Sequence, residues 1–283
     1  MYREDWEAVY LNQDRLLKAF KRLEDRIFLA GGTGLQRFLL PNPYRHSEDL
    51  DFFFPALQNR KSIQQVANEM ADIINSLPNA KIEQLKWIKE EQSYRIWCSF
   101  NDNNEIVKVE LLNFTCSREK DKSFVTQLFK TENFYNLLLY KFKALCDRPD
   151  TIKDLFDIYF ILRELPQINI KELIENMNKK FQKAIGFRYS VNNIINSLKQ
   201  NLKWDIEIAD IKHPFDLQKE IEAFRVNLLE TLETKDSLDF SYKTRIEQNA
   251  KKLNLDTATY LELIEVLEEN SFWANEVILM QEK

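Results

Sequence analysis

The chain has 283 residues, a formal net charge of −5 and 44% hydrophobic residues, which is enough to bury a core without disulfides or metal ions. No run approaches about eighteen uninterrupted apolar residues and the first residues are charged, so we expect no membrane span and no signal peptide. Three widely spaced cysteines exclude a disulfide framework, and we expect a reducing, cytoplasmic location. The acidic balance excludes a strongly basic nucleic-acid-binding surface and leaves room only for a local basic patch.

Hydrophobic periodicity in the first part of the chain predicts helices mixed with strands. Helices are expected over 4–24, 35–40 and 62–77, and strands over 26–30, 49–54, 80–88, 93–100 and 105–114. After about residue 130 helical patterns dominate. Helices are expected there over 132–147, 151–164, 170–183, 190–200, 215–233, 243–252 and 256–269. The predicted fold class is therefore α+β, with a mixed-sheet domain over 1–130 followed by a helical domain over 131–283.

Glycine is scarce, yet Gly31, Gly32 and Gly34 lie within four residues of one another. They follow an apolar strand and precede a short helix, so backbone N–H groups of this turn and the Thr33 hydroxyl can bind phosphate oxygens. The sequence fits neither a P-loop nor a dinucleotide fingerprint. A tight turn with no ligand is the alternative.

Asp49 and Asp51 lie two residues apart on a predicted strand, so both carboxylates project from the same face. Two like charges this close repel each other unless a cation binds between them, and Mg²⁺ prefers carboxylate oxygens. The alternative is a solvated strand end with two surface aspartates.

Glu110 interrupts the apolar strand pattern of residues 106–112, on the face shared with Lys108. If this strand neighbours that of Asp49 and Asp51, three carboxylates converge, as in two-metal nucleotidyl transfer. The alternative is an edge strand with a solvated Glu110 that pairs with Lys108.

These motifs together resemble the AbiEii/AbiGii-type toxin nucleotidyltransferases of the DNA-polymerase-β-like superfamily. The residues that carry the resemblance are Gly31-Gly32-Thr33, Arg45-His46-Ser47-Glu48-Asp49-Leu50-Asp51-Phe52-Phe53, Lys141-Phe142-Lys143-Ala144, Arg148 and Lys153-Asp154-Leu155-Phe156-Asp157. Their order agrees with the family over residues 28–160. Three departures stand out: a longer segment between Thr33 and Asp49, Glu110 in place of Asp, and Leu137 where some members have Gln.

The resemblance implies transfer of a nucleoside monophosphate from an NTP, with Mg²⁺ or Mn²⁺ as cofactor. It implies that Asp49, Asp51 and Glu110 bind metal, with Glu110 completing a second metal site, and that Lys141 neutralises the leaving pyrophosphate. The nucleotide-binding residues it implies are Gly31, Gly32, Thr33, Arg45, Ser47, Lys153, Asp154 and Asp157. Asp154 and Asp157 share a helix face, so they can orient Lys141, contact the nucleotide or position the acceptor.

The resemblance also implies a toxin of a toxin–antitoxin or abortive-infection system, with an antitoxin partner. RNA, including tRNA, is a candidate acceptor, and the basic residues Lys179, Lys180, Lys183 and Arg188 are candidate RNA contacts. Two alternatives remain open. One is transfer to a small molecule or protein, and the other is a non-catalytic nucleotide-binding or interaction protein.

Overall fold

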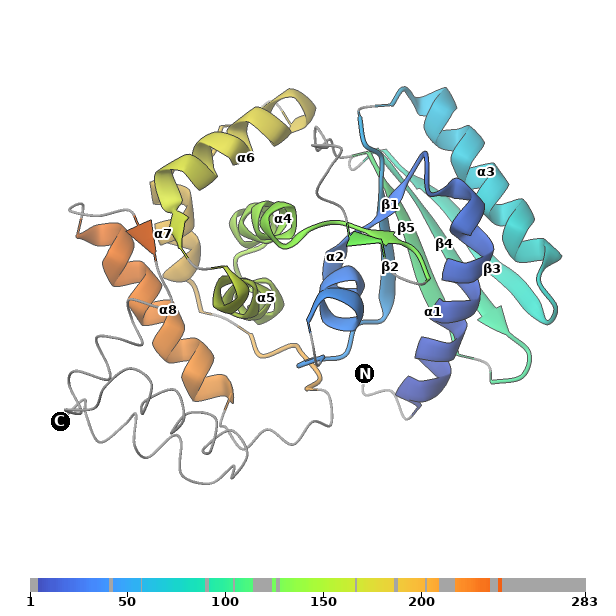
Figure 1. Cartoon of the computed structure of the whole chain (residues 1–283), viewed down its shortest axis with the longest axis horizontal. Helices are drawn as coiled ribbons and strands as arrows, with labels where there is room; N and C mark the ends of the chain where they lie inside the picture. The colour runs from blue at the N-terminus through green and yellow to red at the C-terminus, as the bar shows by residue number, and fades with distance from the viewer. Residues whose placement is uncertain are drawn as a thin grey trace. The chain divides into compact units, whose positions relative to one another are not determined.

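Figure 1 shows the computed structural model of the protein. It describes residues 5–40, 43–56, 58–89, 92–103, 105–113, 124–125, 128–165, 167–185, 188–201, 203–208, 217–234 and 239–240. The chain divides into two units, and each combines separate stretches of sequence. The first unit holds residues 1–137, 178–188 and 207–209, and the second holds 138–177, 189–206 and 210–283. The boundary near residue 130 that the sequence suggests stays a prediction.

The first unit is built on a mixed sheet of seven strands in the order β3-β4-β5-β2-β1-β7-β6. Its elements are α1 (Trp6–Phe20), η1 (Lys21–Leu23), β1 (Phe28–Leu29), α2 (Gly31–Thr33), η2 (Gly34–Leu39), β2 (Asp49–Phe53), α3 (Arg60–Ser76), β3 (Ala80–Ile88), β4 (Ser93–Phe100), β5 (Val107–Leu112), β6 (Phe124–Val125) and β7 (Lys130–Thr131). The pairs β2/β5 and β1/β7 are parallel, and the other pairs are antiparallel. The predicted α+β class with a mixed sheet is confirmed.

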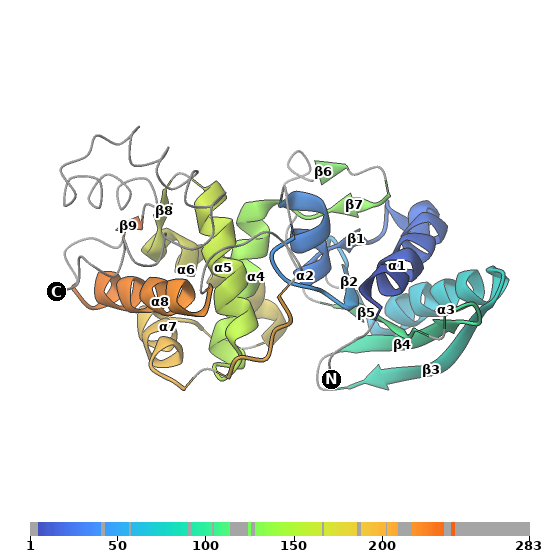
Figure 2. The ribbon, with the colours of Figure 1, turned by 90° about the horizontal axis from the view of Figure 1, so that it is seen from below.

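Helices α1 and α3 pack against one face of this sheet, as Figures 1 and 2 show. Strand residues such as Leu50, Phe52 and Val109 bury their side chains there. The Phe52 ring meets the Phe20 and Phe129 rings edge-on at centroid distances of 5.6 and 5.2 Å. Because strand side chains alternate between faces, the residues between these apolar positions project from the opposite face.

The second unit is mainly helical. Its elements are α4 (Phe134–Asp147), α5 (Ile152–Glu164), β8 (Ile168–Asn169), α6 (Ile170–Ile185), α7 (Val191–Leu198), α8 (Leu217–Glu233) and β9 (Asp239–Phe240), with the first turn of α4 and the end of α6 belonging to the first unit. Helices α4 and α5 lie side by side in both views (Figures 1 and 2). Helix α5 also packs against α8, where the Tyr159 and Phe224 rings meet at 5.2 Å.

The predicted helices and strands agree with the described elements to within a few residues at their ends. Two differences concern short segments: residues 34–39 form a π-helical stretch, and the two-residue strands β6 to β9 were not predicted. A two-residue strand is too short to show alternation, so only its pairing partner reveals it. The helices predicted over 243–252 and 256–269 lie outside the described residues. Within the described part, no helix is both long and apolar enough to cross a membrane.

Candidate active site

Asp49 and Asp51 on β2 lie beside Lys108 and Glu110 on β5. The two strands are parallel, with Asp49 opposite Lys108 and Asp51 opposite Glu110. Side chains directly opposite each other in a sheet project from the same face. All four side chains therefore project from the sheet face that α1 and α3 do not cover. The sheet thus places three carboxylates and one ammonium on a common surface, which we call the acidic face.

Two carboxylates of the acidic face, Asp49 and Glu110, are paired with cations. Lys108 Nζ lies 2.7 Å from Asp49 Oδ2 and 3.0 Å from Glu110 Oε1. Arg95, opposite Glu110 on β4, places Nε 2.8 Å from Glu110 Oε1. The alignment of Nε with Oε1 is not that of a hydrogen bond, so this contact is an ion pair. Because β5 lies between β4 and β2, Glu110 is not on an edge strand, although it does pair with Lys108.

Asp49 illustrates the balance of forces on this face. Burial raises the pKa of Asp49, Lys108 opposes that rise, and the neighbouring carboxylates Glu48 and Glu110 add to it. The desolvation of the charged carboxylate therefore outweighs the attraction of the single ammonium. Lys108 itself is desolvated, yet Asp49 and Glu110 raise its pKa. An additional positive charge near Asp49 is electrostatically favourable.

The Gly31–Gly32 turn lies directly against one of these carboxylates, that of Asp51. The Ala30 N–H donates to the Asp51 carbonyl at 2.8 Å, which joins the turn to β2. Gly31 has a φ of +63°, and a Cβ there would lie 1.8 Å from Asp51 Oδ2. A Cβ on Gly32 would lie 2.5 Å from Arg45 Nη2 and 2.7 Å from Ser47 Oγ. Glycine is required at Gly31 both for its backbone conformation and for the approach of Asp51.

Thr33 and Ser47 are hydrogen-bonded to each other next to this turn, and the Arg45 guanidinium lies near Gly32. The fully buried Thr33 hydroxyl lies 3.0 Å from Ser47 Oγ and also donates to the Asp49 carbonyl. Arg45 Nη1 donates to the His46 carbonyl at 2.9 Å. The Thr33 contacts join the turn to Ser47, in the segment before β2, and to the first residue of β2, Asp49. Ligand binding by these three residues stays a prediction.

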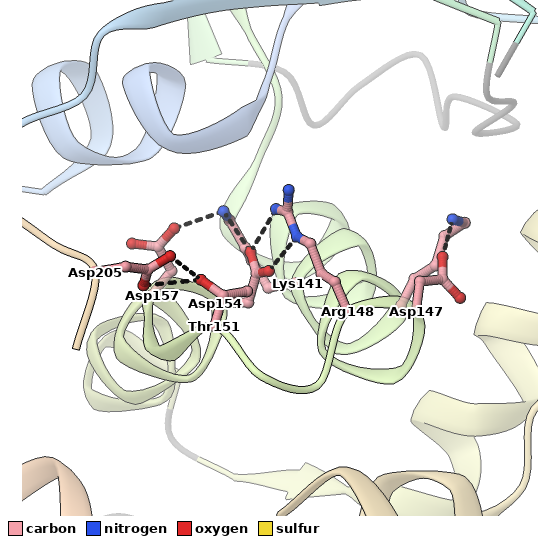
Figure 3. A network of polar contacts seen from close by, with 8 residues as sticks. Lys141, Asp147, Arg148, Thr151, Asp154, Asp157 and Asp205 are labelled. Carbon is pink, nitrogen blue, oxygen red and sulfur yellow. Dashed lines mark hydrogen bonds and ion pairs between the residues drawn. The ribbon is translucent and has the colours of Figure 1, made fainter. Parts of the chain in front are cut away.

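A second charged cluster, which we call the helical cluster, is drawn in Figure 3. It consists of Lys141 on α4, Arg148 directly after α4, and Asp154 and Asp157 on α5. Lys141 Nζ lies 3.1 Å from Asp154 Oδ1 and 2.6 Å from Asp157 Oδ2. Arg148 Nε donates to Asp154 Oδ2 at 2.7 Å. Both aspartates are fully buried, and Lys141 is 6% exposed. The spacing of three residues on α5 points both carboxylates at the same ammonium.

Charge compensation in the helical cluster is strong enough to keep Asp154 ionised. Burial acts to raise the pKa of Asp154, but Lys141 and Arg148 outweigh it and the pKa is lowered. Asp154 also lies in the first turn of α5, where the helix dipole favours a negative charge. Thr151, the N-cap residue of α5, donates its hydroxyl to the two carboxylate oxygens of Asp205 at 2.8 and 2.9 Å. Lys153, in the first turn of α5, is half-buried.

The sequence also matches a family model described as "Nucleotidyl transferase AbiEii toxin, Type IV TA system", over residues 15–248. The chain belongs to the AbiEii nucleotidyltransferase toxin family. The resemblance that the motifs indicated is confirmed, and the protein is a nucleotidyltransferase by family.

Other comparisons add little to the AbiEii assignment. A search among curated proteins gives no match. An H. pylori protein assigned as a nucleotidyltransferase is 20% identical, with 82% of this chain and 98% of that chain covered and a TM-score of 0.47. JHP933 from Helicobacter pylori is 18% identical, with 80% and 94% covered and a TM-score of 0.45. The family assignment therefore rests on the sequence model.

Few side chains in the described part of this AbiEii family member are placed to bind a metal ion. Among the residues that the structure describes, no group of three or more His, Cys, Asp and Glu side chains is placed to hold a metal ion. Mg²⁺ is commonly bound by one or two carboxylates together with substrate phosphates. Asp49 and Asp51 supply two hard oxygen ligands on one strand face, and Asp51 is held against a glycine turn suited to phosphate. This pair fits a nucleotide-bound divalent ion.

Some relevant residues of this AbiEii protein were not singled out from the sequence. Arg95 was not predicted, because the pattern of its strand does not show that Glu110 lies opposite. The presence of a charged residue in a mostly buried strand is nevertheless a signal that could have singled it out. Asp205 carries no signal at all, because it follows α7 and reaches Thr151 only through the fold. Of the candidate RNA contacts, Lys179 and Arg188 are exposed and Lys180 donates to Asn136, while the Lys183 side chain lies outside the described residues.

Proposed function

We propose that this protein transfers a nucleoside monophosphate from an NTP to an acceptor, with pyrophosphate leaving, and that Asp49 and Asp51 bind Mg²⁺ or Mn²⁺. The observation that carries the proposal is the position of Asp51, whose carboxylate oxygen lies against Gly31 in a turn with left-handed backbone. This arrangement puts an acidic pair and a glycine turn side by side. Metal-bound triphosphate needs both kinds of partner.

The residues of the first unit divide the work of binding the triphosphate. A bound ion would neutralise charge on the phosphates and lower the pKa of the acceptor hydroxyl. Backbone N–H groups of Gly31 and Gly32 would donate to phosphate oxygens, and the guanidinium of Arg45, next to Gly32, would add a positive charge. Thr33 and Ser47 would hold the turn in register with β2. A metal-binding role for Glu110 stays a prediction at this point.

Lys141 of the helical cluster is the residue that we assign to the leaving pyrophosphate. Its ammonium is held by two buried carboxylates, Asp154 and Asp157, so its position is fixed before any ligand binds. A preorganised cation of this kind stabilises charge that develops on a leaving pyrophosphate. Lys153 and the two aspartates are additional proposed contacts to the nucleotide.

The proposed biological role is that of the toxin in a type IV toxin–antitoxin or abortive-infection pair, acting in the cytoplasm, where NTPs are plentiful. This rests on the family described above, and it implies a cognate antitoxin. RNA is the proposed acceptor, supported by the exposed basic residues Lys179 and Arg188. The proposed organisation remains a sheet domain over 1–130 and a helical domain over 131–283.

The test uses Asp51→Asn with Asp72→Asn as a matched control, since Asp72 is exposed on α3. Each variant is incubated with each radiolabelled NTP, Mg²⁺ and total RNA, and labelled product and pyrophosphate are measured. We expect turnover in the wild type and in Asp72→Asn, and none in Asp51→Asn. We also expect Mg²⁺ with NTP to raise the melting temperature of the wild type but not of Asp51→Asn. An equal thermal shift in both variants would argue against a metal at Asp51.

A further inference from the structure

Lys108 lies between two carboxylates of the acidic face, which is the kind of position that a bridging ion takes in a two-metal site. Its ammonium lies 2.7 Å from Asp49 and 3.0 Å from Glu110, so it bridges a carboxylate of β2 and a carboxylate of β5. We propose that Lys108 is a built-in cation that replaces the second metal ion, and that Glu110 anchors Lys108 rather than a metal. On this proposal, which rests on the proposed function, a single divalent ion binds at Asp49 and Asp51.

The strand register fixes Lys108 in this place. Lys108 lies directly opposite Asp49, and Glu110 follows it by two residues on the same strand, so both carboxylates are within reach of one side chain. The β5 strand is hydrogen-bonded on both sides, by β4 and by β2. A shift of register that removed Lys108 would turn Val109 out of the core, where it is fully buried.

Arg95 strengthens the case for Glu110 as an anchor. It places a second cation 2.8 Å from Glu110 Oε1, the same oxygen that faces Lys108. The Glu110 side chain is only 11% exposed, so these two cations compensate a largely desolvated charge. A metal ion bound through this oxygen would have to displace both cations. Asp51, by contrast, faces the glycine turn.

The sum of charges on this face also favours one ion. Asp49, Asp51 and Glu110 carry three negative charges, and Lys108 with Arg95 carries two positive charges. One net negative charge remains, and it attracts a single divalent ion that arrives with an anionic nucleotide. A second divalent ion would have to enter where an ammonium already stands, because a metal–oxygen contact of about 2.1 Å and the Lys108 ion pairs need the same space.

Binding of Mn²⁺ alone, followed by electron paramagnetic resonance of the free ion, tests this proposal without relying on activity. We expect the wild type to bind one Mn²⁺ per chain and Lys108→Met to bind two, since removing the ammonium frees Asp49 and Glu110. Lys81→Met is the matched control, because Lys81 pairs with Glu83 on an exposed strand. It should bind one Mn²⁺, as should the charge-conserving Lys108→Arg.

Glu110→Gln keeps the inference falsifiable if Lys108→Met fails to fold. It should still bind one Mn²⁺, because the proposed ligands Asp49 and Asp51 remain. Two ions in the wild type, one ion in folded Lys108→Met, or loss of the ion in Glu110→Gln would overturn the inference. These results leave the proposed function intact as long as the wild type turns over NTP. A wild type that binds no Mn²⁺ and turns over no NTP would overturn both.

Discussion

The acidic face and the helical cluster solve the same electrostatic problem with different means. On the acidic face, Asp49 and Lys108 each keep 28% of their side-chain surface exposed, and the pKa of Asp49 is raised. In the helical cluster, Asp154 and Asp157 are fully buried, and the pKa of Asp154 is nevertheless lowered. Deeper burial goes with the more stable charge.

The difference lies in how many cations each carboxylate receives. Burial raises the pKa of Asp154, but two cations from α4 and the following turn outweigh it. Asp49 has one ammonium, shared with Glu110, and two carboxylate neighbours that oppose ionisation. The helical cluster is therefore electrostatically complete, whereas the acidic face still favours an added cation. This is the pattern expected if the helical cluster holds Lys141 in a fixed position and the acidic face binds an added cation.

Lys141→Ala should have the largest effect, because it removes the ammonium that contacts both buried aspartates, Asp154 and Asp157. We expect the free energy of unfolding to fall by about 3–5 kcal/mol, measured by urea denaturation. In the folded fraction, the transfer rate should fall by roughly 10²–10³ if the ammonium stabilises the leaving pyrophosphate.

Lys143→Ala is the control for Lys141→Ala, since it lies two residues further along α4. Lys143 pairs with Asp147 one turn away and takes no part in the ion pairs that hold Lys141. The rate of NTP transfer should stay near that of the wild type. Equal losses of rate for both lysines would contradict the role assigned to Lys141.

Asp154→Asn should have the next largest effect, about 1.5–3 kcal/mol of unfolding free energy at pH 7, since its charged hydrogen bonds are lost. A lowered folded-state pKa means that this stabilisation is present above the unfolded value of 3.8 and is lost as the pH falls through the folded value. The difference between wild type and Asp154→Asn in urea denaturation should therefore shrink as the pH falls below the unfolded value of 3.8.

Asp49→Asn sharpens the comparison, because the pKa of Asp49 is shifted in the opposite direction from that of Asp154. A raised folded-state pKa means that the charged Asp49 destabilises the fold near neutral pH, and that acidification relieves this cost. We expect Asp49→Asn to match or exceed the wild-type stability at pH 7, with any advantage vanishing as the pH falls toward 3.8. Loss of stability at pH 7 comparable to that of Asp154→Asn would mean that the two clusters do not differ in this way.

Gly31→Ala should lower the free energy of unfolding by about 1–2 kcal/mol, because alanine is strained at positive φ, and displacement of the Asp51 carboxylate adds to this loss. Its effect on function should be far larger, since the new Cβ would displace the Asp51 carboxylate and with it the proposed metal ligand. Gly34→Ala is the control: its backbone is helical and the nearest atom to a new Cβ, Thr131 Cγ2, lies at 3.3 Å. Melting temperature and NTP turnover report the two effects separately.

Local patterns were sufficient to predict most elements of this protein. Helices such as α3 and α5 show a periodicity of apolar residues, and strands such as β4 and β5 show alternation, so each can be recognised from neighbouring residues alone. The candidate positions Asp49, Asp51 and Lys141 were found for the same reason, because their spacing on one strand or their place in a family motif is a property of the linear sequence. The short strands β6 and β7 were missed, since only their pairing partners define them.

The sequence by itself determined the elements, the α+β class and the membership of the AbiEii family, because propensity, periodicity and motif order are local properties. Tertiary structure alone decided that Lys108 bridges Asp49 and Glu110, that Arg95 lies opposite Glu110, and that Asp51 lies against Gly31. These contacts depend on the order and register of strands that are far apart in the chain. Strand pairing is a collective choice made by the buried face of the sheet, so the charges on the other face are placed only once the whole sheet has formed.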